Sequence, residues 1–221
     1  TRARSERAMA TVEAALGGTG SPRQAADAVR ALIGPNAVTQ VAAALQAAYG
    51  AQHTAWLFTL AGIAHHLAAT PAQMIDEADV QRLHQVLRDQ LGVPAARRIG
   101  AAAGRATGDY LLAHRIPRLA QWLLKRMPAA WAAHMLVAAI RRHAWTFAGA
   151  GAFSAQAGEP LRLTIRNGPI GRGAAAGEPV CDFYVHTFLR LFGELVHPQA
   201  QVEEVECQAT GDAACVFELR W

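Results

Sequence analysis

The sequence has no apolar run long enough to cross a lipid bilayer. Its longest apolar stretches, residues 54–64 and 128–140, contain about 11 to 13 residues, whereas a membrane-spanning helix needs about 20. The first ten residues include three arginines but neither an apolar core nor a small-residue cleavage site, which is unlike a secretory signal peptide. We therefore expect a cytoplasmic protein with no membrane span.

Motifs that hold redox or nucleotide cofactors are also missing. Three cysteines are too few to close a disulfide framework or to hold an iron–sulfur cluster with four thiolates from one chain. No G-x-G-x-x-G segment follows an expected strand, and neither a Walker loop nor a G-x-S-x-G elbow is present. The sequence thus contains no self-sufficient apparatus for hydride transfer.

The chain does contain enough apolar residues for a folded core, together with a local excess of positive charge. Of its 221 residues 52% are hydrophobic, which excludes an intrinsically disordered chain. The net charge is +4, but residues 97–142 hold nine basic residues and a single acid. All but one of the 21 basic residues are arginines, which are suited to bidentate contacts with carboxylates or phosphates. This predicts an anionic partner (a carboxylated ligand, an acidic protein or a membrane surface), unless the arginines are simply a solvated helix face.

Hydrophobic periodicity and helix-boundary residues predict that helices come first. Ser21-Pro22 is typical of a helix start, and glycines or prolines are expected to end or break the helices. Pro94 is expected to start a helix bearing the glycine stripe described below, and Pro117 to kink or break the next one. The other helices are expected over residues 21–34, 37–49, 52–69, 83–91, 110–127 and 128–147.

Strands are expected in the last third of the chain. Residues 161–166 alternate between apolar and polar side chains, a helix is expected after Cys181, and residues 201–221 are expected to form a β-hairpin around Gly211-Asp212. This order predicts an α+β fold, with a helical N-terminal half packed on a C-terminal antiparallel sheet.

All three cysteines lie in the last 41 residues, near several acidic side chains. Three thiolates and one carboxylate are an acceptable tetrahedral set for a structural Zn²⁺ site, which would pin the hairpin to the preceding helix. Residues 204 and 207 point to opposite faces of an ideal strand, so the set requires a β-bulge, or Glu203 or Glu206 replaces Glu204. Because no C-x-x-C knuckle is present, three ordinary buried cysteines remain an alternative. The candidate ligands are Cys181, Glu204, Cys207 and Cys215.

A second candidate site lies in the basic region. The run from Arg141 to Phe147 places one imidazole, two aromatic rings and two guanidiniums within two helical turns. These groups can ligate a porphyrin metal, stack on the ring and pair with its propionates. Gly100, Gly104 and Gly108 form a bare stripe, over which either another helix or a planar ligand can approach closely. The periodicity of these residues is equally compatible with packing in the protein core, without a pigment.

The C-terminal stretch from Cys181 to Phe217 resembles the 4-vinyl-reductase domain family, a small-molecule-binding module also found as the sensor part of aromatic-responsive transcription activators. That family's ligand pattern is Cys, Glu, Cys and Cys, with 22, 2 and 7 residues between them, and the four candidate ligands meet these spacings. The resemblance therefore implies zinc, with Glu204 rather than its acidic neighbours as the fourth ligand. Residues 107–117 and 143–149 are also similar to the J-protein family of bacteriochlorophyll biosynthesis, historically assigned as the 4-vinyl (now 8-vinyl) reductase.

This resemblance covers roughly residues 35–221 and implies a domain organisation, a fold, a ligand and partners. The implied organisation is an N-terminal extension with a first helix (1–34) and one ligand-binding domain (35–221), which is mainly helical over 35–150 and of the zinc-binding 4-vinyl-reductase type over 151–221. The implied fold is the ligand-binding fold of nitric-oxide signalling and Golgi transport, often dimeric in its sensor relatives. The implied ligand is a chlorophyll-precursor tetrapyrrole of the Mg-porphyrin or protochlorophyllide type. The implied partners are enzymes of the magnesium branch of tetrapyrrole biosynthesis. We expect no nucleic-acid partner, and peripheral membrane association is compatible with the basic segment.

Since no site for an electron donor is present, we expect an accessory protein that carries or presents the pigment, with no catalytic residues of its own. The alternatives are a vinyl reductase that uses an external donor and a small-molecule-sensing regulatory domain, which would need an output domain. The expected pigment-contacting residues are His143, Trp145, Phe147, Trp122, Trp131, Arg115, Arg118, Arg141, Arg142, Gly104 and Gly108.

Overall fold

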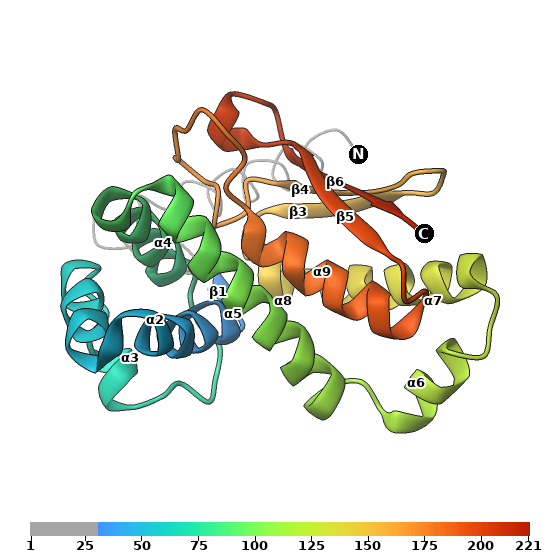
Figure 1. Ribbon diagram of the computed structural model, residues 1–221, viewed down its shortest axis with the longest axis horizontal. Coiled ribbons are helices and arrows are strands. Elements are labelled where there is room, and N and C mark those ends of the chain that lie inside the picture. Colours follow the sequence, from blue (N-terminus) through green and yellow to red (C-terminus); the bar gives the residue numbers. More distant parts are fainter. Residues whose placement is uncertain (1–30) are drawn as a thin grey trace, which may run out of the picture. The chain divides into compact units, whose positions relative to one another are not determined.

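The computed structural model describes residues 31–221, in which helices come first and the main sheet last (Figure 1). The helix expected from Ser21 lies largely outside the described residues, and its expected end is wrong, because residues 32–33 form a strand that pairs with residues 75–76. The elements are β1 (Leu32–Ile33), α2 (Asn36–Leu60), α3 (His65–Ala68), β2 (Ile75–Asp76), α4 (Glu77–Leu91), α5 (Val93–His114), α6 (Arg118–Leu124), α7 (Ala129–Arg142), α8 (Trp145–Ala148), β3 (Ala152–Gln156), β4 (Leu161–Arg166), α9 (Asp182–Leu195), β5 (Gln201–Glu206), a 3₁₀ helix (Gln208–Thr210) and β6 (Cys215–Arg220).

Glycine and proline set most helix boundaries, as expected. Gly50 interrupts α2 with φ 80° and ψ 169°, so the two helices expected on either side of it form one kinked element. The second part of α2 ends at Leu60 rather than residue 69, because Gly62 adopts φ 70° and turns the chain before α3. Pro117 separates α5 from α6. The helix expected to reach Phe147 ends at Arg142, where His143 leaves the helical conformation and α8 follows as a separate turn.

The glycine stripe packs against a helix. A Cβ atom at Gly104 would lie 2.3 Å from the carbonyl oxygen of Phe183, and one at Gly108 would lie 2.6 Å from Cβ of Arg190. Helix α9 therefore approaches the backbone of α5 at a distance that only glycine permits. The Thr187 hydroxyl donates a hydrogen bond to the Gly104 carbonyl at 3.1 Å across this contact. Of the two alternatives for the stripe, the structure shows helix packing.

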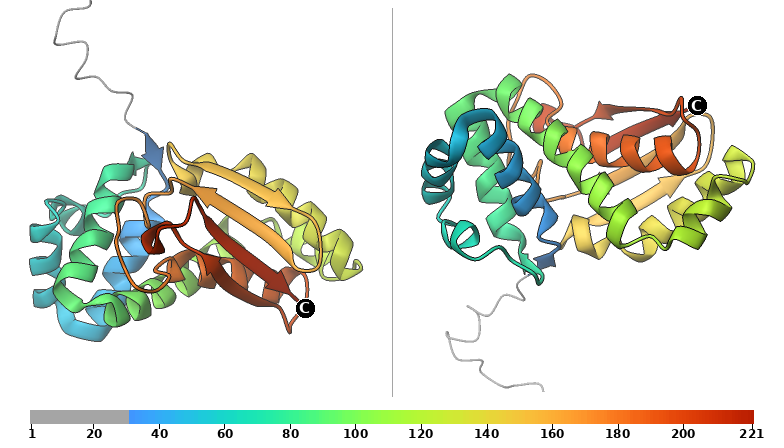
Figure 2. Two further views of the ribbon diagram at one scale, coloured as in Figure 1. Left: turned by 90° about the horizontal axis from the view of Figure 1, so that it is seen from above. Right: turned by 60° about the horizontal axis from the view of Figure 1, so that its bottom comes forward.

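The main sheet has the strand order β3-β4-β6-β5, with every neighbouring pair antiparallel. In β4 the apolar residues 161, 163 and 165 are buried and Arg162 and Arg166 are exposed, as the alternation predicts. Helix α9 packs on the face that carries Phe217, whose ring lies 5.5 Å from that of Phe188. The four strands lie over the helices when seen from above (Figure 2, left). The expected α+β arrangement, helices packed on an antiparallel sheet, is confirmed.

The chain ends as the expected hairpin, although its connection is longer than a tight turn. Strands β5 and β6 pair with each other, and the 3₁₀ helix followed by Gly211 at φ 101° joins them. Within residues 31–221, no helix combines the length and the apolar character needed to cross a bilayer.

Candidate functional site

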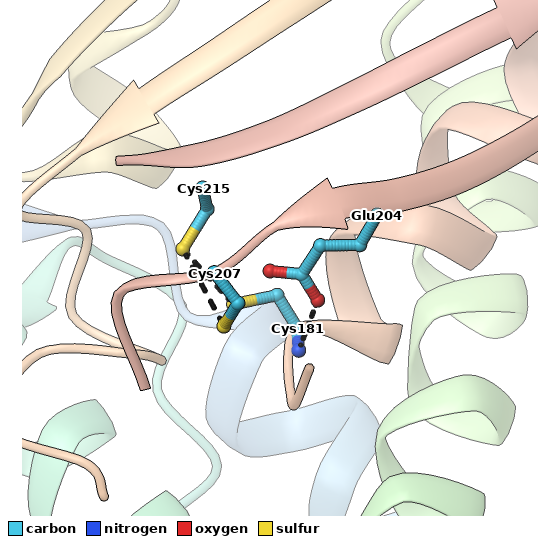
Figure 3. Close-up of side chains that lie close together, drawn as sticks. All are labelled: Cys181, Glu204, Cys207 and Cys215. Carbon is cyan, nitrogen blue, oxygen red and sulfur yellow. Dashed lines mark hydrogen bonds between the residues drawn. The ribbon is translucent and has the colours of Figure 1, made fainter. Parts of the chain in front are cut away.

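Three segments of the C-terminal half bring four candidate metal ligands together (Figure 3). Cys181 precedes α9, Glu204 lies in β5, Cys207 follows the end of β5, and Cys215 opens β6. One ligand atom from each of them lies within 4.8 Å of all the others. The sulfur atoms of Cys181 and Cys215 are 3.5 Å apart, and those of Cys207 and Cys215 are 3.9 Å apart.

A β-bulge allows Glu204 and Cys207 to share one side of the hairpin. Glu204 pairs with Phe217 and Glu206 pairs with Val216, so Val205 is an extra residue in β5. The bulge reverses the side-chain alternation beyond it and removes the geometric objection raised by an ideal strand. The neighbouring acids point elsewhere: the Glu203 side chain is 71% exposed and contacts Arg220, and Glu206 is exposed.

The four side chains lie in a dry environment that disfavours several negative charges. Cys181, Cys207 and Cys215 are buried. Burial raises the pKa of Glu204 to about 8, and the neighbouring Cys207 adds to this effect. Hydrogen bonds to Cys207 and Cys215, together with burial, raise the pKa of the Cys181 thiol well above its usual value. Hydrogen bonds received from Cys181 and Cys215 lower the pKa of Cys207. Burial and these mutual interactions therefore oppose the ionisation of all four groups together.

The geometry fits a tetrahedral metal ion. Zinc–sulfur bonds of about 2.3 Å at tetrahedral angles place two sulfurs about 3.8 Å apart, close to the observed 3.5 and 3.9 Å. One oxygen of Glu204 accepts a hydrogen bond from the backbone N–H of Cys181 at 2.9 Å, whereas its buried Oε1 has no hydrogen-bond partner among the described residues. A carboxylate oxygen without a partner beside three thiols is what a fourth ligand position requires. Four protein ligands would leave no open position, as in structural sites.

Two residues near the sulfurs were missed by the sequence analysis. Arg88 in α4 is buried and donates to the Ile170 carbonyl at 3.0 Å, and burial lowers its pKa. Gly171 packs against the site, because a Cβ atom there would lie 3.3 Å from the sulfur of Cys181. No sequence signal connects Arg88 to the cysteines. Gly171 was visible only as part of a G-x-G segment that lacks the dinucleotide-binding pattern.

The expected pigment-contacting residues separate into an exposed group and a packed group. All the aromatic and basic members except Phe147 are exposed, with Arg115 at the end of α5 and the others on, or beside the ends of, α6, α7 and α8. Phe147 is half-buried, with its ring 5.5 Å from that of Phe153 and its carbonyl accepting a hydrogen bond from the Tyr184 hydroxyl. Gly104 and Gly108 lie beneath α9 and do not face a ligand. The exposed members are Arg115, Arg118, Trp122, Trp131, Arg141, Arg142, His143 and Trp145.

His143 presents one ring nitrogen outward. Its Nδ1 lies 2.9 Å from the carbonyl oxygen of Ala139, and because a carbonyl only accepts, Nδ1 carries the proton in this contact. In the neutral ring the lone pair is then on Nε2, the arrangement typical of histidine ligands oriented by a second hydrogen bond. The side chain is exposed, so Nε2 is accessible to a ligand.

A surface hollow of about 380 Å³ lies between α2 and α5, and none of the expected pigment-contacting residues lines it. Its lining residues are Ala44, Ala47, Ala48, Tyr49, Arg98, Ile99 and Ala102.

Comparison with known proteins places these features in a family. The V4R domain model matches residues 161–221, which include the four candidate ligands. The bacteriochlorophyll synthase 23 kDa chain of Cereibacter sphaeroides is 40% identical over 201 residues, which cover 91% of this chain and 94% of that protein. The chain belongs to the family of the bacteriochlorophyll synthase 23 kDa chain. A second member, from Rhodobacter capsulatus, is 37% identical over 187 residues, which cover 85% of this chain and 86% of that one.

The fold of this family member is also found in H-NOX proteins. An Fe(II) unliganded H-NOX protein mutant from K. algicida superposes with a TM-score of 0.56 at 11% identity, covering 85% of this chain and 96% of that one. At this identity the likeness concerns the fold alone. It confirms the fold that the resemblance implied, helices on an antiparallel sheet of the nitric-oxide-signalling type.

Proposed function

We propose that this protein has a role in bacteriochlorophyll biosynthesis, in which it binds a chlorophyll-precursor tetrapyrrole and presents it to other enzymes of the pathway. The two relatives named as bacteriochlorophyll synthase chains support the pathway. The accessible Nε2 of His143, held by the Ala139 carbonyl, is the observation that supports pigment binding. The homodimer implied by the family resemblance stays a prediction.

The proposed pigment site is the exposed end of α7 and the start of α8. In this site Nε2 of His143 would ligate the Mg²⁺ of the macrocycle. The exposed Arg141 and Arg142 guanidiniums would pair with its propionates, and Trp145 would stack on the ring. A Mg-porphyrin ligand supplies the metal, whereas the protein supplies orientation and keeps the pigment in a defined pose. The chain itself adds no electron donor.

Absorption titration with Mg-protoporphyrin and with protochlorophyllide tests pigment binding. We expect the Soret band to shift on binding and the shift to require His143, so that His143→Ala abolishes it. His134→Ala, which removes another exposed histidine of α7, is the matched control and leaves the shift intact. An unchanged shift in His143→Ala would remove the axial-ligand assignment.

The same preparation distinguishes a carrier from a vinyl reductase. A carrier consumes neither NADPH nor reduced ferredoxin when a divinyl pigment is added. Conversion of divinyl to monovinyl pigment by the isolated chain with either donor would establish the reductase instead and would refute the carrier.

We further propose that Cys181, Glu204, Cys207 and Cys215 hold a structural zinc ion. The converging sulfur atoms and the unpartnered buried oxygen of Glu204 support this assignment. When bound, zinc keeps all four groups ionised and ties the hairpin to the start of α9. Elemental analysis of freshly purified protein is expected to find about one zinc per chain. A zinc-free preparation that folds normally in the presence of a chelator would return the cysteines to ordinary core residues.

Substitution of the acidic residues of β5 identifies the fourth ligand. Glu204→Gln is expected to weaken zinc binding in a chelator competition. Glu203→Gln and Glu206→Gln, which alter exposed neighbours in the same strand, are matched controls that leave zinc binding unchanged. Equal weakening in all three variants would contradict the assignment of Glu204.

A further inference from the structure

Helix α6 exposes most of its large apolar side chains. Of its seven residues only Leu124 is buried. Leu119 is 76% exposed, Trp122 is 51% exposed and Leu123 is 45% exposed. These three residues are separated by three and four positions and therefore lie on one face of the helix. This apolar face of α6 is therefore largely exposed.

Helix α7 continues this exposed apolar surface. It buries residues 132, 133, 136 and 137 against the protein, while Trp131 is 69% exposed and Met135 is 45% exposed. Trp131 and Met135 are four positions apart and share a face. We refer to the five exposed residues of the two helices as the α6–α7 patch: Leu119, Trp122, Leu123, Trp131 and Met135.

The segment that contains the patch has positive charge only. Residues 110–158 contain no aspartate or glutamate, and their six cations are all exposed. Within residues 31–221, Lys125 is the one cation of the six that has an ion-pair partner, Glu194. The Arg126 guanidinium lies 4.4 Å from the centre of the Trp122 ring, so charge and aromatic surface meet within the patch. The six cations are Arg115, Arg118, Lys125, Arg126, Arg141 and Arg142.

We propose that the α6–α7 patch docks on the surface of an anionic lipid bilayer. Helices that bind in the membrane interface combine exposed Trp and Leu on one face with a basic rim, and tryptophan concentrates at the headgroup level. Each cation near an anionic surface contributes to binding, and the absence of acids in the segment leaves nothing to oppose it. The proposal depends on neither the zinc ion nor the pigment.

The positive charge around the α6–α7 patch argues against a second copy of this chain as its binding partner. A twofold interface through the patch would place the basic rims of two molecules against each other with no acid in the segment to neutralise them. The five residues of the patch are also distinct from the proposed pigment site, which shares only Arg141 and Arg142 with the six cations of the segment. Trp131 and His143 are separated by 12 residues, or about 18 Å along a helix.

Vesicle co-sedimentation of the full chain, without pigment, tests the proposal. We expect binding to vesicles of equimolar phosphatidylcholine and phosphatidylglycerol, weak binding to phosphatidylcholine alone, and release by salt because the attraction is screened. The double variant Trp122→Ser, Trp131→Ser is expected to lose binding. Trp56→Ser is the matched control, since Trp56 is a 44% exposed tryptophan on α2.

Two double variants that each remove two positive charges complete the test. Arg118→Gln with Arg126→Gln is expected to weaken binding to the anionic vesicles roughly tenfold to thirtyfold at low salt. Arg98→Gln with Arg166→Gln removes the same charge from exposed positions outside the segment and is expected to change binding far less. All the substituted side chains are at the surface, so circular dichroism and the melting temperature should be unchanged and report correct folding.

Three results would overturn the proposal. They are failure of the wild-type chain to sediment with the anionic vesicles, equal losses in the patch variants and their controls, and concentration-dependent self-association that the Trp122→Ser, Trp131→Ser variant abolishes. The last result would assign the patch to a second copy of the chain.

Discussion

His84 is expected to make the folded protein sensitive to acid. Its side chain lies in α4, is 6% exposed, and has a buried Nε2 without a hydrogen-bond partner among the described residues. Burial, with the nearby positive charge of Arg88, lowers the pKa of His84 from 6.5 to about 3. The unfolded chain therefore binds a proton below pH 6.5 that the folded protein takes up only near pH 3, so stability is lost as the pH falls through this window.

The size of the effect follows from the two pKa values. Between pH 7 and pH 5 the unfolding free energy should fall by about 2 kcal/mol through His84 alone, and by about 3 kcal/mol at pH 4. Denaturant titration of wild type and His84→Gln at each pH measures this as a difference, which cancels metal loss common to both proteins. His134→Gln, on an exposed histidine of α7, should retain the wild-type slope. Equal pH slopes for wild type and His84→Gln would refute the reasoning.

Three further predictions concern packing and the metal centre. Gly104→Ala places a methyl group 2.3 Å from the Phe183 carbonyl oxygen and should lower the unfolding free energy by about 2 kcal/mol or more in denaturant titration. Gly193→Ala places its methyl group in open space on helix α9 and should raise the unfolding free energy by roughly 0.5–1 kcal/mol. If Gly193→Ala instead lowered the unfolding free energy as much as Gly104→Ala, the close α5–α9 contact would not explain the effect at Gly104. Cys207→Ser should lower the melting temperature and release zinc while leaving pigment affinity per folded molecule unchanged, because a structural site acts through stability; a change of pigment affinity at full folding would place the metal in the pigment site.

The order of elements was predictable because its signals are local. Gly50, Gly92 and Pro117 act on their own backbone, so their positions fix where helices kink, end or break. The alternation of apolar and polar side chains over residues 161–166 predicts a strand with one buried face, and the structure confirms this strand. The wrong predictions of secondary structure concern segments whose conformation depends on a partner far away in the chain. The strand at residues 32–33 depends on pairing with residues 75–76, which no local pattern encodes.

The candidate metal centre could be named from the sequence only in part. The spacing identified the candidate ligands, but the side-chain alternation of an ideal strand argued against Glu204. The β-bulge at Val205 removes this objection, and it leaves no distinctive signal in the sequence. The proximity of Arg88 could not be predicted, since this residue interacts electrostatically with Cys181 and Cys207 from a helix far away in the chain. For the glycine stripe, periodicity described the bare face of α5 but not what covers it, and α9 lies about 80 residues further along the chain.

Titration of the purified chain with Mg-protoporphyrin is the most direct test of pigment binding. We expect a saturable shift of the Soret band that His143→Ala abolishes and His134→Ala preserves, with no consumption of NADPH or reduced ferredoxin. A folded, zinc-loaded protein whose addition leaves the spectra of both Mg-protoporphyrin and protochlorophyllide unchanged would contradict this expectation.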